Sequence, residues 1–163
     1  CCRFDETDAR PMGRNSTGVR GINIDDDDEV IGAINYDPKA EDASAHTVLV
    51  VSENGFGKRT DFDEYRITNR GGKGVKTINI TEKTGKLIAI KNVTENDDLM
   101  IIEKSGLTIR MAVSDIRVAG RATQGVKLIN IKNGDSIAAI STVEKSGDEE
   151  QPTAEESSEA PQE

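Results

Sequence analysis

A short basic motif occurs three times along the chain and constrains the fold more than any single residue. Each copy has one arginine, a second arginine four positions later and a Gly-Val pair four positions after that; the copies cover residues 10–19, 66–75 and 117–126. An Ile-Asn-Ile triplet follows each copy, at residues 22–24, 78–80 and 129–131. Repeats spaced by about fifty residues are typical of propellers and solenoids, in which each unit packs against its neighbours. The chain is therefore expected to be an array of similar units.

The sequence around each motif predicts four β-strands per unit. Apolar runs on either side of a glycine-containing turn indicate a hairpin in the second and third copies, and the first copy has only the returning half, residues 2–4. The Ile-Asn-Ile triplet is typical of a third strand with one buried face, and a fourth strand follows. The expected hairpins are 48–51 with 56–60 and 99–102 with 108–111; the expected fourth strands are 31–34, 87–90 and 137–140. This pattern predicts an all-β, propeller-like fold of four-stranded blades.

These signals divide the chain into about three blades, the first incomplete, and two segments outside the repeats. The expected units are a partial blade at 1–37, a polar linker at 38–47, a blade at 48–94, a blade at 95–144 and an acidic tail at 145–163. The tail is rich in Glu, Ser and Pro and is almost free of large apolar residues. It is expected to be disordered. One interpretation is that it only keeps the chain in solution; our hypothesis is the other, that it competes with DNA for the basic loops.

Charge and cysteine content limit the classes of function. The net charge is −9, but residues 145–163 hold seven of the acidic residues against one lysine, so the net value hides a basic character in the repeated loops. The two cysteines are adjacent, which excludes a disulfide framework or a zinc site within the chain and favours a reduced, cytoplasmic setting. No stretch is apolar enough to predict a membrane span.

The repeated loops concentrate cations and glycines, a combination suited to binding phosphates. The glycines expected to allow close approach or positive φ are Gly18, Gly71, Gly72, Gly74 and Gly125. The cations expected to bind DNA are Arg10, Arg14, Arg20, Lys58, Arg59, Arg66, Arg70, Lys73, Lys76, Arg110, Arg117, Arg121 and Lys127. The alternative is that the arginines pair with nearby carboxylates and the glycines only form turns. Recurrence in three copies, together with the family resemblance given below, favours DNA contact.

Other chemistry has little support in the sequence. There is no recognition-helix pattern, and aromatic residues make up only 3% of the chain, so binding to duplex backbone without sequence readout is expected. Tyr65 is interpreted as a packing residue, His46 as a solvated residue of the linker, and the run Asp25–Asp28 as an exposed acidic turn. We expect neither catalytic residues nor a metal site.

Several blocks resemble the C-terminal domain of the A subunit of bacterial DNA gyrase, namely residues 13–21, 54–60, 64–65, 70–75 and 120–126. The resemblance covers residues 1–144, about half of the six blades of that family. It implies a β-pinwheel that wraps duplex DNA around a basic rim. It also implies that DNA cleavage lies outside this chain and that no cofactor binds to it. By the same resemblance, ATP and Mg²⁺ are expected to be used by a B subunit, which joins two A subunits in a bacterial cytoplasmic complex that introduces negative supercoils.

Two alternatives remain open at this stage. One is the C-terminal domain of the A subunit of topoisomerase IV, which has a related but degenerate pinwheel. The other belongs to a different class, a propeller that serves as a scaffold for protein partners. Salt separates DNA binding from protein docking, because contacts between apolar patches survive an ionic strength that abolishes binding to the phosphate backbone.

Overall fold

A computed structural model describes residues 1–132 and 134–145. In this part of the chain the regular elements are β-strands and short 3₁₀ helices, without any α-helix, in agreement with the predicted all-β class. The expected disordered tail, apart from Lys145, lies outside the described residues. The strands are β1 (Thr47–Ser52), β2 (Phe56–Asp61), β3 (Leu87–Val93), β4 (Asp97–Glu103), β5 (Thr108–Ala112), β6 (Val126–Lys127) and β7 (Ile137–Glu144). The 3₁₀ helices are η1 (Glu6–Asp8), η2 (Ala43–Ala45), η3 (Phe62–Glu64) and η4 (Val113–Asp115).

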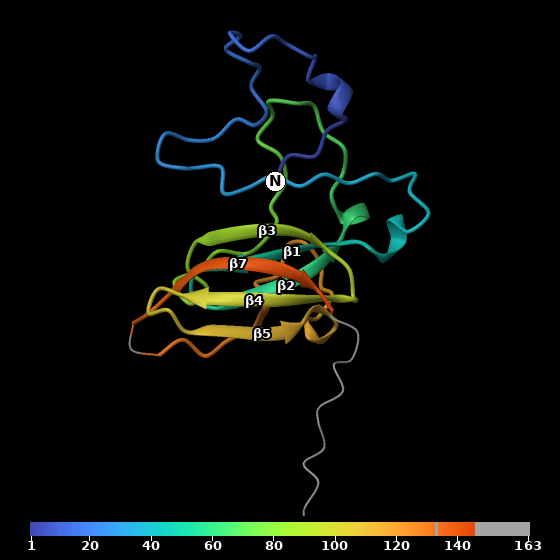
Figure 1. Cartoon of the computed structure of the whole chain (residues 1–163). Helices are drawn as coiled ribbons and strands as arrows, with labels where there is room; N and C mark the ends of the chain where they lie inside the picture. Colours follow the sequence, from blue (N-terminus) through green and yellow to red (C-terminus); the bar gives the residue numbers. More distant parts are fainter. Residues whose placement is uncertain (133, 146–163) are drawn as a thin grey trace, which may run out of the picture.

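The strands form two antiparallel sheets, with orders β3-β1-β2-β6 and β5-β4-β7 (Figure 1). Both predicted hairpins are confirmed, since β1 pairs with β2 and β4 pairs with β5. The predicted fourth strands of the second and third units are also present as β3 and β7, which pair with β1 and β4. Each pairing contains one register shift, at Val51/Ser52 and at Ile102/Glu103.

The prediction that the Ile-Asn-Ile triplets form strands is wrong. Residues 22–24, 78–80 and 129–131 lie outside the strands, and the short strand β6 precedes the third triplet. β6 does not complete its own unit but pairs with β2 of the unit before it, through Gly57 opposite Val126. The apolar pattern of the triplets reflects core packing instead, because Ile78 and Ile129 are buried.

The same exchange links the first unit to the second. The amide of Val75 donates to the carbonyl of Cys1 at 2.7 Å, and the amide of Thr68 donates to that of Arg3 at 2.7 Å. These bonds match the one from Ala119 to the carbonyl of Arg59 at 2.9 Å in the following pair of units. The second and third units thus each place the segment that carries the basic motif against the hairpin strand of the preceding unit, which connects the units in series.

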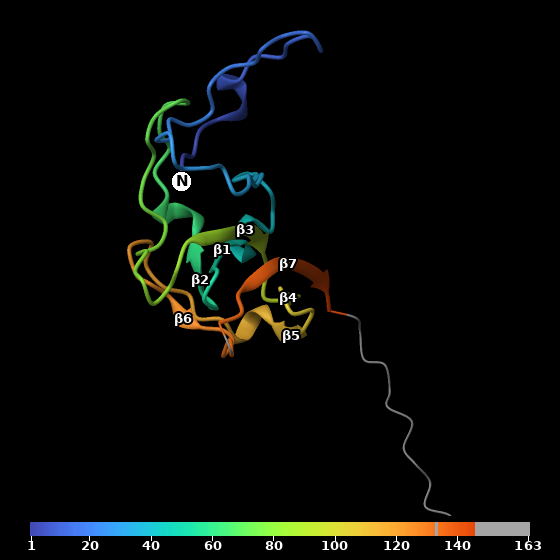
Figure 2. The same ribbon diagram turned by 90° about the vertical axis from the view of Figure 1, so that its left-hand side faces the viewer.

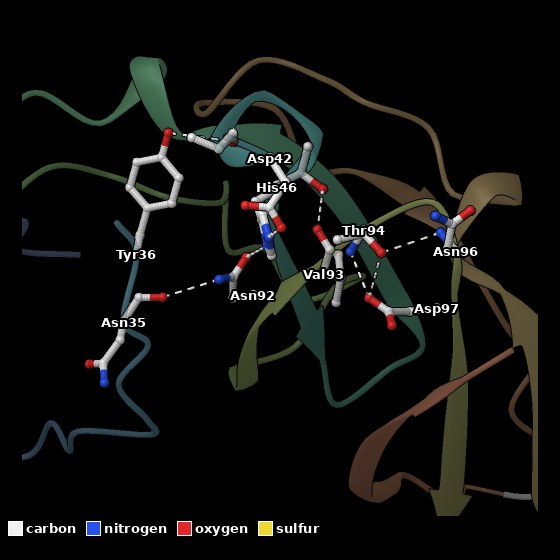
Figure 3. A network of polar contacts seen from close by, with 11 residues as sticks. Asn35, Tyr36, Asp42, His46, Asn92, Val93, Thr94, Asn96 and Asp97 are labelled. Atoms are coloured by element: carbon white, nitrogen blue, oxygen red, sulfur yellow. Dashed lines mark hydrogen bonds and ion pairs between the residues drawn. The ribbon is translucent and has the colours of Figure 1, made fainter. Parts of the chain in front are cut away.

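The predicted strand at 31–34 is not formed. In the other two units the equivalent strand pairs with the first strand of the hairpin, and in this chain the first unit has only the returning half of that hairpin. The segment packs against β3 instead: Ile34 and Tyr36 join the second core cluster, and Asn92 donates through Nδ2 to the carbonyl of Asn35 at 3.1 Å (Figure 3).

Strand β1 lies at the centre of two hydrophobic clusters. Leu49 and Val51 pack with residues of the second sheet, whereas Val48 and Val50 pack with a second group that includes Tyr65. Because β1 is buried on both faces, it is a continuous apolar run without the alternation of a half-exposed strand. Each fully buried Val or Leu contributes about 1.5–3 kcal/mol, so these four side chains of β1 stabilise its packing against both clusters.

The polar linker is fixed to β3, contrary to the interpretation of His46 as solvated. His46 is half-buried, with Nδ1 2.9 Å from Oδ1 of Asn92 and Nε2 3.3 Å from Oδ2 of Asp42 (Figure 3). The hydroxyl of Thr47 donates to the carbonyl of Val93 at 3.4 Å. These contacts give His46 a structural role in attaching the linker to the sheet.

Candidate nucleic-acid interface

The three basic loops share one backbone conformation at their repeated spacing. Gly18, Gly74 and Gly125, which end the three motifs, have φ values of +80°, +74° and +80°. A φ in this range favours glycine, because other residues rarely adopt it. Gly71, within the second loop, also has a positive φ of +78°. The predicted need for positive φ is therefore confirmed at these four positions; at Gly72 the φ is not positive.

Two of these glycines also allow adjacent units to come into contact. A Cβ added to Gly125 would lie 2.5 Å from the carbonyl oxygen of Gly57, and one added to Gly74 would lie closer still to that of Cys1. Both positions are far inside van der Waals contact. Gly74 and Gly125 thus bring each basic loop against the hairpin strand of the preceding unit.

The second arginine of the second motif and that of the third motif each bind the unit before them. Arg121 donates from Nε to the carbonyl of Glu64 at 3.2 Å and from Nη1 to that of Lys76 at 2.5 Å. Arg70 makes the equivalent pair of bonds, to the carbonyl of Asp8 at 2.9 Å and to that of Arg20 at 2.6 Å. Both arginines are half-buried.

These bonds place the basic loops beside one another. The guanidinium of Arg70 lies at the end of the first loop and that of Arg121 at the end of the second. Figure 2 shows the second and third loops, green and orange, along the same side of the sheets. Consecutive loops are thus adjacent, as a row of cations along one duplex requires.

Six exposed cations occupy two equivalent positions in each of the three loops. The first arginine of each motif is exposed, and so is the cation that follows each Gly-Val pair. Lys73 is exposed as well and lies 3.9 Å from Asp25, a weak contact between two solvated side chains. The six equivalent residues are Arg10, Arg66 and Arg117 at the start of the loops, and Arg20, Lys76 and Lys127 at their ends. Arg14 is also exposed.

The structure removes Lys58 from the expected interface. Lys58 lies on β2 and is completely buried. Its Nζ donates to the carbonyls of Gly120 at 2.7 Å, Arg121 at 2.5 Å and Thr123 at 3.1 Å, with the hydroxyl of Thr123 at 3.2 Å. Burial and, secondarily, the charge of Arg121 lower the pKa of Lys58 from 10.5 to about 8. Lys58 therefore anchors the third loop to β2 through hydrogen bonds. Because its side chain is buried, it is not available to contact DNA.

Arg59 and Arg110 are also engaged inside the chain. Arg59 is 4% exposed and donates from Nε to the carbonyl of Ile116 at 2.7 Å, with Nη1 3.2 Å from the carboxylate of Glu95. The expectation that Arg59 binds DNA is wrong for the same reason as for Lys58. Arg110 stays half-exposed on β5 but donates from Nε to Asp98 at 2.7 Å.

The alternative in which the loop arginines pair with carboxylates is not what the structure shows. In the described part of the chain, the ion pairs of arginine join Arg59 to Glu95 and Arg110 to Asp98, and both arginines lie on hairpin strands. The loop arginines Arg70 and Arg121 bind neutral carbonyl oxygens. Their charge is therefore not cancelled by an acidic partner.

Other sites receive little support from the described residues. Tyr65 is buried and its hydroxyl lies 2.5 Å from that of Thr77, which confirms its role in packing. Within residues 1–132 and 134–145, no group of three or more His, Cys, Asp or Glu side chains could hold a metal ion. The same residues contain no helix long and apolar enough to cross a membrane.

The fold and the loops define a repeat protein of propeller-like units, linked by exchanged strands, with one basic loop per unit. The family model for the DNA gyrase C-terminal domain, a beta-propeller, matches residues 3–36, 46–94 and 97–144. The chain belongs to this family. Each matched segment contains one copy of the basic motif.

Relatives of known name agree with this assignment. The A subunit of DNA gyrase from Staphylococcus aureus (strain MRSA252) is 46% identical over 148 residues, which are 91% of this chain and 16% of the relative. The corresponding protein of Staphylococcus epidermidis (strain ATCC 12228 / FDA PCI 1200) is 44% identical over 146 residues, 90% of this chain and 16% of the relative. The chain thus spans only a small part of the length of these relatives.

Solved structures show the same fold. The C-terminal domain of DNA gyrase A superimposes with a TM-score of 0.75 at 23% identity, over 85% of this chain and 45% of that one. The C-terminal domain of DNA topoisomerase IV superimposes with a TM-score of 0.76 at 18% identity, over 87% of this chain and 43% of that one. The all-β, propeller-like architecture predicted from the repeats and the β-pinwheel implied by the resemblance are therefore confirmed.

Proposed function

We propose that this chain is part of the DNA-wrapping domain of the A subunit of a DNA gyrase. It binds and bends duplex DNA without sequence specificity and so supports ATP-dependent negative supercoiling. The family membership supports a role beside DNA, and one geometric observation carries the binding mode: the loops of successive units are hydrogen-bonded side by side, with exposed cations at equivalent positions. In this proposal two gyrase B subunits and a second A subunit complete an A₂B₂ complex in the bacterial cytoplasm.

The proposed chemistry is electrostatic. Arginine and lysine at the loop starts and ends neutralise phosphates and release counterions, and the bending of the duplex is offset by many contacts of this kind. We assign this chain a binding role only. Strand cleavage is assigned to another part of the A subunit, and ATP hydrolysis with Mg²⁺ to the B subunit.

Salt titration of DNA binding by the intact A subunit tests the proposal. If the six equivalent cations each neutralise one phosphate, log K falls against log salt with a slope of about −5. The double variant Lys76→Ala/Lys127→Ala should flatten the slope by about 2. The matched control, Lys104→Ala/Lys132→Ala, removes two exposed lysines outside the basic loops and should leave the slope unchanged. A slope near zero for the wild type would contradict the proposal.

Topoisomerase IV is the second candidate because its C-terminal domain has the same fold. The identity of 46% to a gyrase A subunit favours gyrase. The assembled enzyme decides between them: gyrase introduces negative supercoils into relaxed circles with ATP, whereas the alternative predicts relaxation and decatenation only.

A further inference from the structure

In the second loop and in the third, one arginine donates hydrogen bonds to both ends of the preceding loop. Glu64 lies two residues before the second loop's first arginine, and Lys76 is the cation at the end of that loop. Arg121 binds the carbonyls of both. Arg70 binds the carbonyls of Asp8 and Arg20, which flank the first loop in the same way. The arrangement therefore recurs, donor by donor, at two successive junctions.

This contact depends on the shape of the guanidinium group. The planar fork of arginine presents Nε and Nη donors in fixed directions, so one side chain can bind two oxygens from different segments. The lysine ammonium is a single point at the end of a flexible stem and does not reproduce this geometry. An Arg→Lys substitution at Arg70 or Arg121 thus keeps the charge and removes the two-point contact.

We propose that Arg70 and Arg121 are positioning residues, which set the spacing between successive DNA-binding loops and are not themselves the main phosphate ligands. This inference rests on the proposed DNA-wrapping function. It divides the motif into two roles: the first arginine and the cation after Gly-Val face the duplex, whereas the second arginine fixes one loop against the next. The path of the wrapped DNA then depends on a contact between protein segments.

The partial burial of these arginines agrees with this division. Arg70 and Arg121 are half-buried and use two donors each on carbonyls, whereas Arg66 and Arg117, four residues earlier, are exposed. The carbonyl of Lys76 accepts from Arg121 while the side chain of Lys76 remains exposed. Lys76 thus takes part in the positioning contact through its backbone carbonyl, while its side chain is one of the proposed DNA-binding cations.

The test compares charge-preserving variants in the intact A subunit, assembled with its B partner. The positioning variants are Arg121→Lys and Arg70→Lys, and the charge-preserving controls are Lys104→Arg and Lys132→Arg, at two exposed lysines outside the basic loops. Two quantities are measured: the salt slope of duplex binding, and the change in linking number captured when a nicked circle is sealed with protein bound. We expect the positioning variants to keep a salt slope within about 1 of the wild-type slope. We expect them to reduce the captured linking-number change at least twofold relative to the wild type. We expect the controls to retain both.

Other outcomes overturn the inference. If Arg121→Lys and Arg70→Lys wrap DNA like the wild type, the two-point contact does not set the path. If Arg121→Ala flattens the salt slope by about 1 and Arg121→Lys restores full wrapping, Arg121 acts as a phosphate ligand. Loss of the β-sheet circular dichroism signal in both lysine variants would show that the contact serves folding instead. Failure of the proposed function is distinct, because the wild type itself would then capture no linking-number change.

Discussion

Lys58 provides the most direct test of how the basic loop is attached to the sheet. The substitution Lys58→Met keeps most of the apolar stem and removes the ammonium that binds four oxygens of residues 120–123. An ammonium has three protons, so it satisfies at most three of these oxygens at once. We therefore expect the substitution to destabilise the folded chain.

The size of the effect follows from the burial of the site. Hydrogen bonds to charged groups contribute about 1.5–3 kcal/mol each. The loop carbonyls are only partly buried, so water can replace some of the lost bonds. The expected decrease in the free energy of unfolding is about 2–4 kcal/mol. With a urea m-value of about 2 kcal/mol/M, the unfolding midpoint moves down by about 1–2 M.

Urea unfolding followed by far-UV circular dichroism measures this difference. The control is Lys127→Met on β6, because Lys127 is exposed and the same change there should alter stability by less than about 0.5 kcal/mol. A Lys58→Met variant as stable as this control would refute the role assigned to the buried ammonium.

Two further predictions concern the same junction. Because the pKa of Lys58 is lowered from 10.5 to about 8, the unfolded chain binds the Lys58 proton more tightly than the folded chain between these pH values. The stability of the wild type relative to Lys58→Met should therefore rise by roughly 1 kcal/mol per pH unit from pH 8 to pH 10, and a fall would contradict the assignment. Gly125→Ala combines a φ of +80° with a Cβ placed 2.5 Å from the carbonyl of Gly57, and should cost about 3 kcal/mol in thermal or urea unfolding. Gly134→Ala, with a φ of +69° and open space around it, should cost only about 1 kcal/mol, and equal costs would argue against the close approach.

The repeat made the units and their hairpins predictable from the sequence. Apolar runs and a glycine turn are local signals, and they located β1 with β2 and β4 with β5. The exchange of β6 onto β2 was not predictable in this way, since it joins Gly57 to Val126, which are far apart in the chain. β6 has only two residues, which is too short to show the alternation of apolar and polar residues by which a strand is predicted.

The candidate site was predicted in part, because charge alone does not show which side of a strand a residue occupies. As charged residues, Lys58 and Arg59 would be expected to face solvent. In the structure β2 pairs with β1 on one side and with β6 on the other, and the loop of the next unit packs over it. One signal was available: an arginine recurs on the returning strand as Arg3, Arg59 and Arg110. Arg3 donates to the carbonyls of Phe62 and Tyr65, much as Arg59 donates to that of Ile116, so this recurrence marks a structural position.

The central claim is that cations at equivalent positions of adjacent loops face the same duplex. Mass-spectrometric footprinting tests it most directly, by comparing the acetylation rate of each lysine in the intact protein with and without a duplex long enough to wrap. The account predicts that DNA protects Lys73, Lys76 and Lys127, which lie in the loops, and leaves Lys104 and Lys132 as reactive as before. Equal reactivity of the loop lysines in both states, or protection confined to Lys104 and Lys132, would contradict it.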